Sequence, residues 1–231
     1  MKCKEFLRNE CRGWKPWEAV WLAFACGMIT VLSIYWRDTV MGIISAVTGV
    51  ACVVSTGKGK PGAYLFGTVN VVLYAIISWQ AKYYGEVMLN LLYYLPMEFY
   101  GFYVWSRHMN AETHEVEKKQ MSVRGRLLLS LAVTLGTVAY GFILKLLGGE
   151  LPFFDAMSTV ISVAAMIISV KMYYEQWVLW IIVDAVTVFM WGLAFARGND
   201  SIATLLMWIV YLGNAVIMYI KWAKEAKLNA V

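Results

Sequence analysis

The feature that most constrains this chain is a series of eight apolar stretches, each close to the length that crosses a lipid bilayer. They cover residues 17–35, 39–56, 62–80, 86–105, 127–147, 153–170, 176–195 and 202–220. A spanning helix needs about 20 predominantly apolar residues. Only 15% of the residues are charged and 61% are hydrophobic, whereas soluble domains carry about 25% charged residues. The sequence therefore predicts an all-α integral membrane protein embedded in the lipid bilayer.

The distribution of Lys and Arg predicts the orientation of these helices. Most breaks between the stretches are short, so neighbouring helices are expected to run antiparallel, and the one long polar break is 106–126. With the N-terminus inside, 16 Lys and Arg of the connecting segments and termini lie on the inner side and 4 on the outer side. Short cytoplasmic loops of membrane proteins carry such an excess. Both termini are therefore predicted to be cytoplasmic.

The first stretch admits two other interpretations. Basic residues precede it as in a signal peptide, but the run is long and no small-residue cleavage site follows its end, "LSIYWRDT". Glu18 and Trp21 also suit a helix lying along the membrane interface, but the five basic residues before it would then be outside. We expect an uncleaved spanning helix ahead of the others.

An internal repeat organises the remaining stretches. The segment "LFGTVNVVLY" (65–74) aligns with "LWIIVDAVTV" (179–188), which places Asn70 on Asp184 at an offset of 114. The same offset aligns 45–55 with 159–169, and a small gap brings Glu98 near Asn214. Each repeat holds three helices, and one helix separates the repeats. Because three is odd, the extra crossing lets both repeats point the same way, as in a parallel repeat about the membrane normal.

The predicted fold class is thus a 3+1+3 transmembrane helix bundle with an additional N-terminal helix. The parts are a cytoplasmic N-terminus with the extra helix (1–38), the first three-helix repeat (39–105), a cytoplasmic loop (106–126), a linker helix (127–147), the second three-helix repeat (153–220) and a cytoplasmic tail (221–231).

Asp184 is the most informative polar residue, because it lies near the centre of the stretch 176–195. A carboxylate at the centre of a spanning helix costs about 2.5–3.5 kcal/mol on insertion scales, and such residues normally face the protein interior or an aqueous cavity. At about 100° per residue, one helical face carries Trp177, Trp180, Asp184 and Trp191, flanked by Gln176 and Thr187. The opposite face is purely apolar, with Val178, Ile182, Ala185 and Phe189.

Other stretches also carry polar residues at mid-depth. Asn70 is central in 62–80, the spacing of Asn90, Tyr94 and Glu98 places them on one face of 86–105, and Trp208, Tyr211 and Asn214 share a stripe in the last stretch. Within 86–105, Pro96 is a candidate for a kink. Carboxylates, amides and flat rings from both repeats are expected to converge and to bind a polar ligand that bears an aromatic ring.

Each of these residues also has a simpler interpretation. Intramembrane Asn and Gln can serve only as hydrogen-bonded links between helices, which is the alternative for Asn70 and Asn214. For Trp177 and Trp191, near the ends of their stretch, anchoring at the membrane interface is as good an explanation as ligand contact. Trp180 is deeper, which favours ligand stacking.

Several other classes of site lack support in the sequence. His108 and His114 lie in the polar linker and are predicted to be solvated rather than metal ligands, and Cys3, Cys11, Cys26 and Cys52 have no metal-ligand spacing and are predicted to be free thiols. The segment "GKGKPG" lacks the P-loop spacing, and neither GxSxG nor HExxH occurs. We expect no cofactor and no nucleic-acid partner.

From about residue 40 to 222 the chain resembles the PnuC family of bacterial nicotinamide riboside transporters. The resemblance rests on the segments "YLFGTVNVVLYAIISWQ", "LYYLPMEFYGFYVWSR" and "FFDAMSTVISVAAMIISVKMYYEQWVLWIIVDAVTVFMW". The family's W-x-x-W-(I/V)-x-x-(N/D) element corresponds to Trp177, Trp180 and Asp184, and some relatives carry Asn at the last position. The resemblance implies a SWEET-like fold, a homotrimer in the bacterial inner membrane, and facilitated diffusion of the riboside followed by phosphorylation by a cytoplasmic kinase.

The substrate implied by the resemblance suits these residues. Nicotinamide riboside is a cationic aromatic ring with a carboxamide and a ribose. Trp180 can stack on the ring, Asn70, Asn90 or Gln176 can bond the carboxamide or ribose, and Asp184 or Glu98 can complement the charge. The alternative substrate is another vitamin such as thiamine, also a cationic ring. From other classes, an intramembrane enzyme and a structural membrane subunit remain alternatives.

Overall fold

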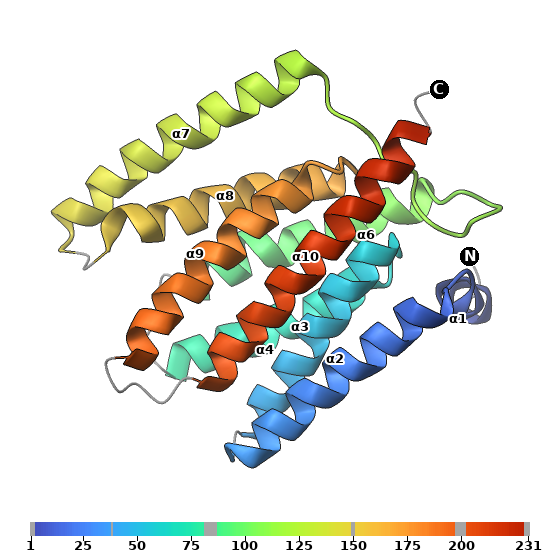
Figure 1. Cartoon of the computed structure of the whole chain (residues 1–231), viewed down its shortest axis with the longest axis horizontal. Coiled ribbons are helices and arrows are strands. Elements are labelled where there is room, and N and C mark those ends of the chain that lie inside the picture. Colours follow the sequence, from blue (N-terminus) through green and yellow to red (C-terminus); the bar gives the residue numbers. More distant parts are fainter. Residues whose placement is uncertain (1–2, 38, 81–86, 149–150, 197–201, 229–231) are drawn as a thin grey trace. The chain divides into compact units, whose positions relative to one another are not determined.

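The structure is a computed structural model that describes residues 3–37, 39–80, 87–148, 151–196 and 202–228. In these ranges the elements are helices, and isolated bridges are the only extended pairing described. In chain order they are α1 (Cys3–Cys11), α2 (Pro16–Tyr35), α3 (Val40–Lys58), α4 (Ala63–Gln80), the π-helical segment η1 (Leu89–Tyr94), α6 (Leu95–Arg107), α7 (Val123–Leu146), α8 (Pro152–Val170), α9 (Gln176–Ala196) and α10 (Ile202–Leu228) (Figure 1).

The long helices coincide with the apolar stretches predicted from the sequence. Five of them are long and apolar enough to cross a membrane within the described residues, namely α2, α3, α4, α7 and α8, and α9 adds a shorter apolar segment, Gln176–Phe189. Their large apolar side chains are widely exposed. Such surface is stable only in contact with lipid or another apolar partner, so the all-helical, multi-pass membrane character is confirmed. α1 is a further short helix that the sequence did not indicate.

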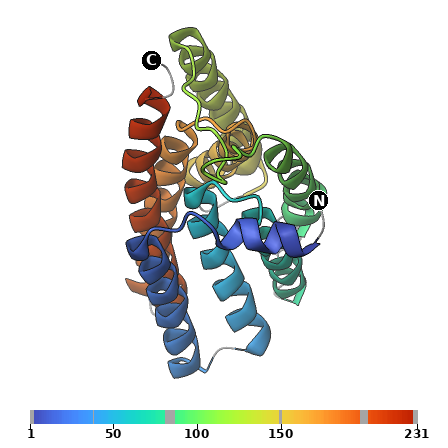
Figure 2. The ribbon, with the colours of Figure 1, turned by 90° about the vertical axis from the view of Figure 1, so that its right-hand side faces the viewer.

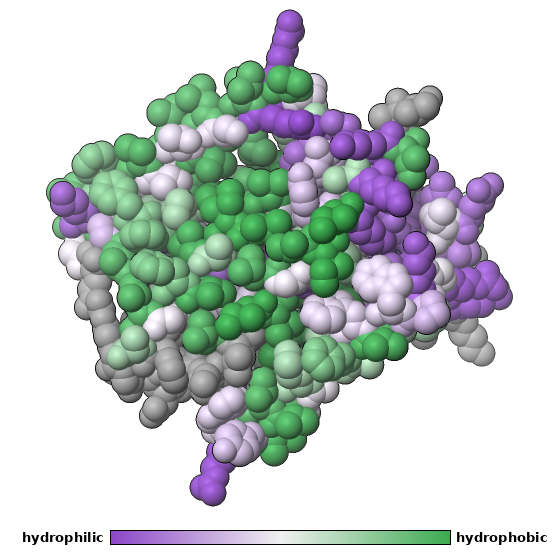
Figure 3. All heavy atoms as spheres, viewed as in Figure 1, coloured by the Kyte–Doolittle hydropathy of each residue, from purple (hydrophilic) through white to green (hydrophobic). Residues whose placement is uncertain are grey.

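The chain forms two compact units, residues 1–117 and 118–231, so the division falls inside the predicted polar loop. In the first unit α2 packs on α3, α3 on α4, and α4 on η1 and α6. Figure 2 shows α1 lying crosswise to α2 and α3. In Figure 3, hydrophilic side chains gather around α1 and the loop that follows α6, whereas hydrophobic side chains cover the middle of the helices.

In the second unit α7 packs on α8, α8 on α9, and α9 on α10. The α7–α8 contact is close because α7 presents glycines to it: a Cβ added to Gly141 would strike the ring of Phe153, and one added to Gly136 would lie 3.1 Å from Val160. Small residues at helix contacts are typical of membrane bundles. Gly141 is the one buried residue of α7 and most of its large apolar side chains are exposed, so its outer face is available to lipid or to another protein.

The helix predicted for 86–105 is not a regular α-helix. Leu89–Tyr94 is π-helical, and the N–H of Leu95 donates to the carbonyl of Asn90, five residues earlier. Pro96 lies at the start of α6 and has no N–H to donate to an α-helical carbonyl. The irregularity therefore lies where the sequence placed a kink. Asn90 and Glu98 are buried and Tyr94 is half-buried, and their predicted position on a single face stays a prediction.

Helices α4 and α6 approach each other through a reciprocal pair of glycines. A Cβ on Gly101 of α6 would collide with the ring of Tyr64 on α4, and a Cβ on Gly67 of α4 would collide with the carboxylate of Glu98 on α6. Tyr64 is itself held edge-on against Trp105, with ring centroids 5.0 Å apart. The ring cannot easily retreat, since both aromatic residues are buried.

The substitution Gly101→Ala is accordingly expected to lower the free energy of unfolding by about 1–3 kcal/mol, the usual cost of overpacking a close contact. The matched control is Gly213→Ala in α10, where a Cβ would meet nothing within 4 Å. Thermal unfolding of the purified variants in detergent measures both. Equal melting temperatures for the two variants would contradict the close α4–α6 contact.

Candidate functional site

The first turn of α9 carries buried polar groups with no hydrogen bond. Gln176 is 0% exposed and Trp177 is 2% exposed. Neither the amide oxygen and nitrogen of Gln176 nor the indole Nε1 of Trp177 has a hydrogen-bond partner among the described residues. A buried polar group without a partner costs about 1–3 kcal/mol, so native proteins keep few of them unless they bind something. This pair is the strongest indication of a ligand site.

The two faces of α9 differ as predicted. Asp184 is buried and Trp180 half-buried, on the side of Gln176 and Trp177. All four residues of the predicted apolar face are exposed: Val178, Ile182, Ala185 and Phe189. The carboxylate of Asp184 therefore turns away from the exposed side of the helix. The side chain of Trp191, also predicted for the polar face, lies outside the described residues.

Trp177 does not lie at an exposed interface. Its ring packs edge-on against Trp222 of α10, with centroids 5.8 Å apart, and both rings are buried. Interfacial anchoring, which needs a ring at the lipid–water boundary, does not fit such burial. Also on α10, Asn214 is buried, and Trp208 contacts Tyr211 with centroids 5.4 Å apart.

In the first unit, Glu98 and Asn90 are buried and Tyr94 is half-buried. One carboxylate oxygen of Glu98, Oε2, is buried without a partner in the described part of the chain. The carboxylate lies against the backbone of Gly67, where the missing side chain leaves room for it. Glu98 is thus a second buried acceptor, now within the first unit.

Asn70 has a structural partner. Its amide nitrogen donates to the carbonyl of Ser45 at 2.7 Å and lies 3.2 Å from the Ser45 hydroxyl. It therefore links α4 to α3, which is the simpler of the two roles that the sequence left open. The expected meeting of polar residues from both repeats concerns the placement of one unit against the other, and it stays a prediction.

Helices α4 and α9 share one packing feature at their first turns. Tyr64 and Trp177 are each the second residue of their helix, and each packs edge-on against a buried tryptophan. The three-helix repeat that aligns Asn70 with Asp184 stays a prediction.

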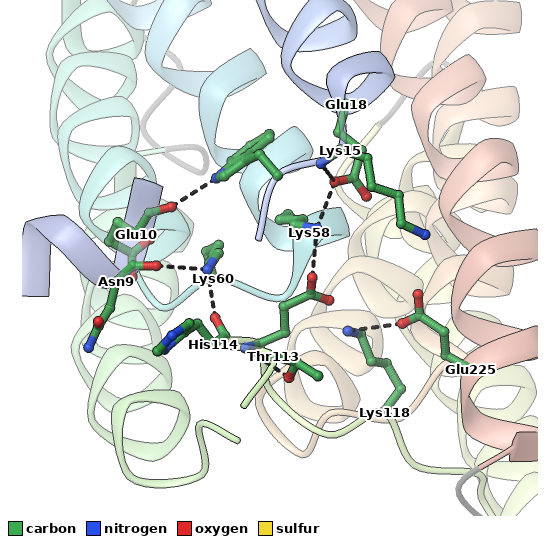
Figure 4. Close-up of polar contacts among 12 residues, drawn as sticks. Asn9, Glu10, Lys15, Glu18, Lys58, Lys60, Thr113, His114, Lys118 and Glu225 are labelled. Carbon is green, nitrogen blue, oxygen red and sulfur yellow. Dashed lines mark hydrogen bonds and ion pairs between the residues drawn. The ribbon is translucent and has the colours of Figure 1, made fainter. Parts of the chain in front are cut away.

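A cluster of buried charges, which the sequence did not reveal, joins the N-terminal segment to the α3–α4 turn (Figure 4). The ammonium group of Lys58 lies 2.6 Å from Glu18 and 2.6 Å from Glu115. The ammonium group of Lys60 donates to the carbonyls of Asn9 at 2.8 Å and His114 at 2.6 Å. From the sequence alone, both lysines count only among the basic residues that predict the orientation of the helices in the membrane.

Glu10 belongs to the same region. Its carboxylate lies against Gly62, where a Cβ would be 2.6 Å from Oε2. Burial raises the pKa of this carboxyl above its ordinary value, while a hydrogen bond to the backbone of Gly62 and the charge of Lys60 lower it. Together these contacts fix α1 and the loop after α6 to the end of the first unit.

The equivalent turn of the second unit, between α8 and α9, is held by the chain that precedes α7 and by the first turn of α7. The carboxylate oxygen Oε1 of Glu175 accepts from the N–H of Met121 at 3.0 Å and from Nε of Arg126 at 2.8 Å. Arg126 also donates to the hydroxyl of Tyr174 at 3.1 Å. Burial, and then the neighbouring carboxylate of Glu175, raise the pKa of Tyr174 above its ordinary value, while the charge of Arg126 lowers it in part.

Apolar spanning helices with buried carboxylates and unpartnered amide and indole groups define a class, the multi-pass membrane transporters, because a scaffold needs no such groups at depth. Residues 39–224 match the family model described as nicotinamide mononucleotide transporter. The chain belongs to this family, which includes the nicotinamide riboside transporters PnuC and consists of transporters, not enzymes.

Relatives match along nearly the whole chain. The nicotinamide riboside transporter PnuC of Neisseria mucosa is 44% identical over 223 residues, which cover 94% of this chain and 85% of the relative. The PnuC protein of Haemophilus influenzae is 33% identical over 222 residues, with 93% of each chain covered. The crystal structure of a vitamin B3 transporter PnuC superposes with a TM-score of 0.84 at 40% identity, covering 96% of this chain and 97% of that one.

Proposed function

We propose that this protein transports nicotinamide riboside across the membrane by facilitated diffusion. The observation that carries the proposal is a pair of buried side chains, Gln176 and Trp177, whose polar atoms have no hydrogen-bond partner among the residues that the structure describes. They lie at the start of the helix that also carries Trp180 and Asp184. An amide can bond the carboxamide or ribose of the ligand. An indole face attracts a cationic ring, and a carboxylate complements its charge.

Within the proposal, each site residue has a role. In the second unit Gln176, Trp177, Trp180, Asp184 and Asn214 form one group of ligand contacts, and in the first unit Asn90, Tyr94 and Glu98 form another. Asn70, whose amide nitrogen is engaged by Ser45, keeps its side-chain oxygen for the ligand.

The riboside is favoured over the mononucleotide that gives the family model its name. A phosphate group carries about −1.5 to −2 charges at neutral pH. It needs a cation, yet the stretches 62–80, 86–105, 176–195 and 202–220 contain neither Lys nor Arg. The buried carboxylates of Glu98 and Asp184 would repel it. Thiamine, also a cationic ring, remains the alternative substrate.

The resemblance to PnuC supplies the rest of the proposal. It includes a parallel 3+1+3 helix arrangement of the SWEET type, alternating access, a homotrimer, cytoplasmic termini in a bacterial inner membrane, and trapping of the riboside by a cytoplasmic kinase. The exposed apolar face of α7 supports contact with lipid or with other copies, and the excess of Lys and Arg on the inner side supports the orientation.

A titration of the purified protein in detergent tests the substrate. Intrinsic tryptophan fluorescence is followed with nicotinamide riboside, its mononucleotide, nicotinamide, thiamine and riboflavin. We expect saturable quenching by the riboside, and binding of the mononucleotide weaker by at least about tenfold, because a charge is buried without a partner. Saturation by thiamine or the mononucleotide instead would overturn the substrate assignment.

The variant Trp180→Ala tests whether the fluorescence quenching arises from binding at the proposed ligand site. It is expected to weaken riboside binding, since it removes the stacking surface. The control is Ile143→Ala on the exposed face of α7, which should bind as the unmodified protein does. Equal losses of binding in both variants would remove Trp180 from the site.

A further inference from the structure

The α8–α9 turn is held by backbone and side-chain hydrogen bonds from the segment before α7 and from the first turn of α7. On one side the N–H of Lys119 donates to the carbonyl of Met172 at 2.9 Å, and the N–H of Tyr174 donates back to the carbonyl of Lys119 at 3.0 Å. On the other side the carboxylate of Glu175 binds the N–H of Met121 and the guanidinium of Arg126. The first turn of α7 and the segment before it thus grip residues 172–175.

This turn needs such support because its backbone is strained. Met172 has a φ of 65°, in the left-handed region that residues other than glycine seldom adopt. Strained backbone persists only where the surrounding contacts fix it. The corresponding turn of the first unit has Gly59 at this position, with a φ of 80°, where a glycine is free of the strain.

The first turn of α9 is built directly on the gripped residues. The N–H groups of Gln176, Trp177 and Val178 donate to the carbonyls of residues 173, 174 and 175 at 3.3, 3.1 and 3.1 Å. Any movement of Tyr174 or Glu175 is therefore passed to Gln176 and Trp177, whose side chains have no hydrogen-bond partner in the described part of the chain.

We infer that Arg126 and Glu175 are positioning residues for the transported ligand: their ion pair holds the start of α9 so that Gln176 and Trp177 are presented in a fixed geometry. This inference deepens the proposed function and rests on it for the identity of the ligand. It gives helix α7 a part in binding, although none of the proposed ligand contacts lies on α7.

The pair is suited to this role by its geometry. The side chain of Glu175 is 10% exposed and that of Arg126 is 37% exposed, and Nε of Arg126 lies 2.8 Å from the Glu175 oxygen. Arg126 also lies over the ring of Tyr174, with its Cζ 5.7 Å from the centroid. A single guanidinium thereby contacts both residues that precede Gln176.

Hydrogen exchange of the backbone amides tests the grip without any ligand. In Arg126→Gln and Glu175→Gln, peptides covering 172–178 are expected to exchange about tenfold faster, in line with the loss of one hydrogen bond to a charged group. Arg126→Lys, which keeps the charge, should restore part of the protection. The control is Arg124→Gln, in the same helical turn but exposed, which should exchange as the unmodified protein does.

The Kd for the riboside, measured in these four variants and in the double variant of Arg126→Gln with Glu175→Gln, tests whether the ion pair serves ligand binding. We expect the Kd to rise about tenfold in Arg126→Gln and Glu175→Gln, with Arg126→Lys intermediate, and the double variant to be no worse than either single one because the two residues act as a pair. A changed Kd with unchanged melting temperature separates positioning from general stability.

Two results would overturn the inference. Unchanged amide exchange in the peptides covering 172–178 would show that the Arg126–Glu175 ion pair does not stabilise the α8–α9 turn, whichever ligand the protein binds. Faster amide exchange in 172–178 with an unchanged Kd for the riboside would show that the ion pair stabilises the turn but does not serve ligand binding. Failure of the proposed function gives a different result, because the unmodified protein would then not bind the riboside while the exchange difference would persist.

Discussion

Replacing Gln176 with leucine is expected to weaken riboside binding by at least about tenfold and, in the same variant, to raise the melting temperature. The two effects share one cause. Leucine fills nearly the same volume but removes an amide whose oxygen and nitrogen are buried without partners, and removal of such groups relieves a cost of about 1–3 kcal/mol. The ligand, in contrast, loses the hydrogen bonds that the amide would supply.

The measurement is a tryptophan-fluorescence titration paired with thermal unfolding in detergent. The control is Gln80→Leu at the exposed end of α4, which should change neither quantity. Gain of stability with full riboside affinity would show that the Gln176 amide is not a ligand contact, and the assignment of the site to the start of α9 would then fail.

Lys58→Met is expected to destabilise the protein by about 3–5 kcal/mol, the usual cost of removing one partner from a buried ion pair. Lys58 is 2% exposed and Glu18 is 1% exposed, so the variant leaves the Glu18 carboxylate buried without its cation. Glu115 loses the same partner. The expected result is a large drop in melting temperature, measured by thermal unfolding in detergent.

The design includes a control and a compensating variant. Lys224→Met, in an exposed position on α10, should shift the melting temperature little. The double variant Lys58→Met with Glu18→Met should recover part of the loss, because it removes the more deeply buried of the two carboxylates that Lys58→Met leaves without their cation. A single Lys58→Met variant as stable as Lys224→Met would mean that the ion pair does not hold α2 to α3.

The sequence predicted the helices well because their signal is repeated along many residues. Each apolar stretch is a sum over about 20 positions, so α3, for example, begins and ends within two residues of its predicted range. The faces of α9 were also predictable, since Val178, Ile182, Ala185 and Phe189 follow α-helical spacing and are all exposed.

The remaining features depend on contacts between residues distant in the chain. No local pattern shows that Lys58 is neutralised by Glu18 and Glu115, because the same lysine in solvent would look identical in sequence. The π-helical turn before Pro96 alters the phase of a helix without changing its composition. The edge-on packing of Tyr64 on Trp105 and of Trp177 on Trp222 likewise joins residues too far apart in the chain for a local pattern to show it.

The two inter-helix turns acquire their partners at different times during synthesis. Every group that grips the turn at 172–175 lies earlier in the chain, so the strained Met172 leaves the ribosome after Lys119, Met121 and Arg126 have been made. Lys58 meets Glu18 at once but waits for Glu115 until the loop after α6 has been translated. Because domains are completed from the N-terminus onward, the turn after α3 waits longer for its last ion-pair partner than the turn after α8 waits for its hydrogen bonds.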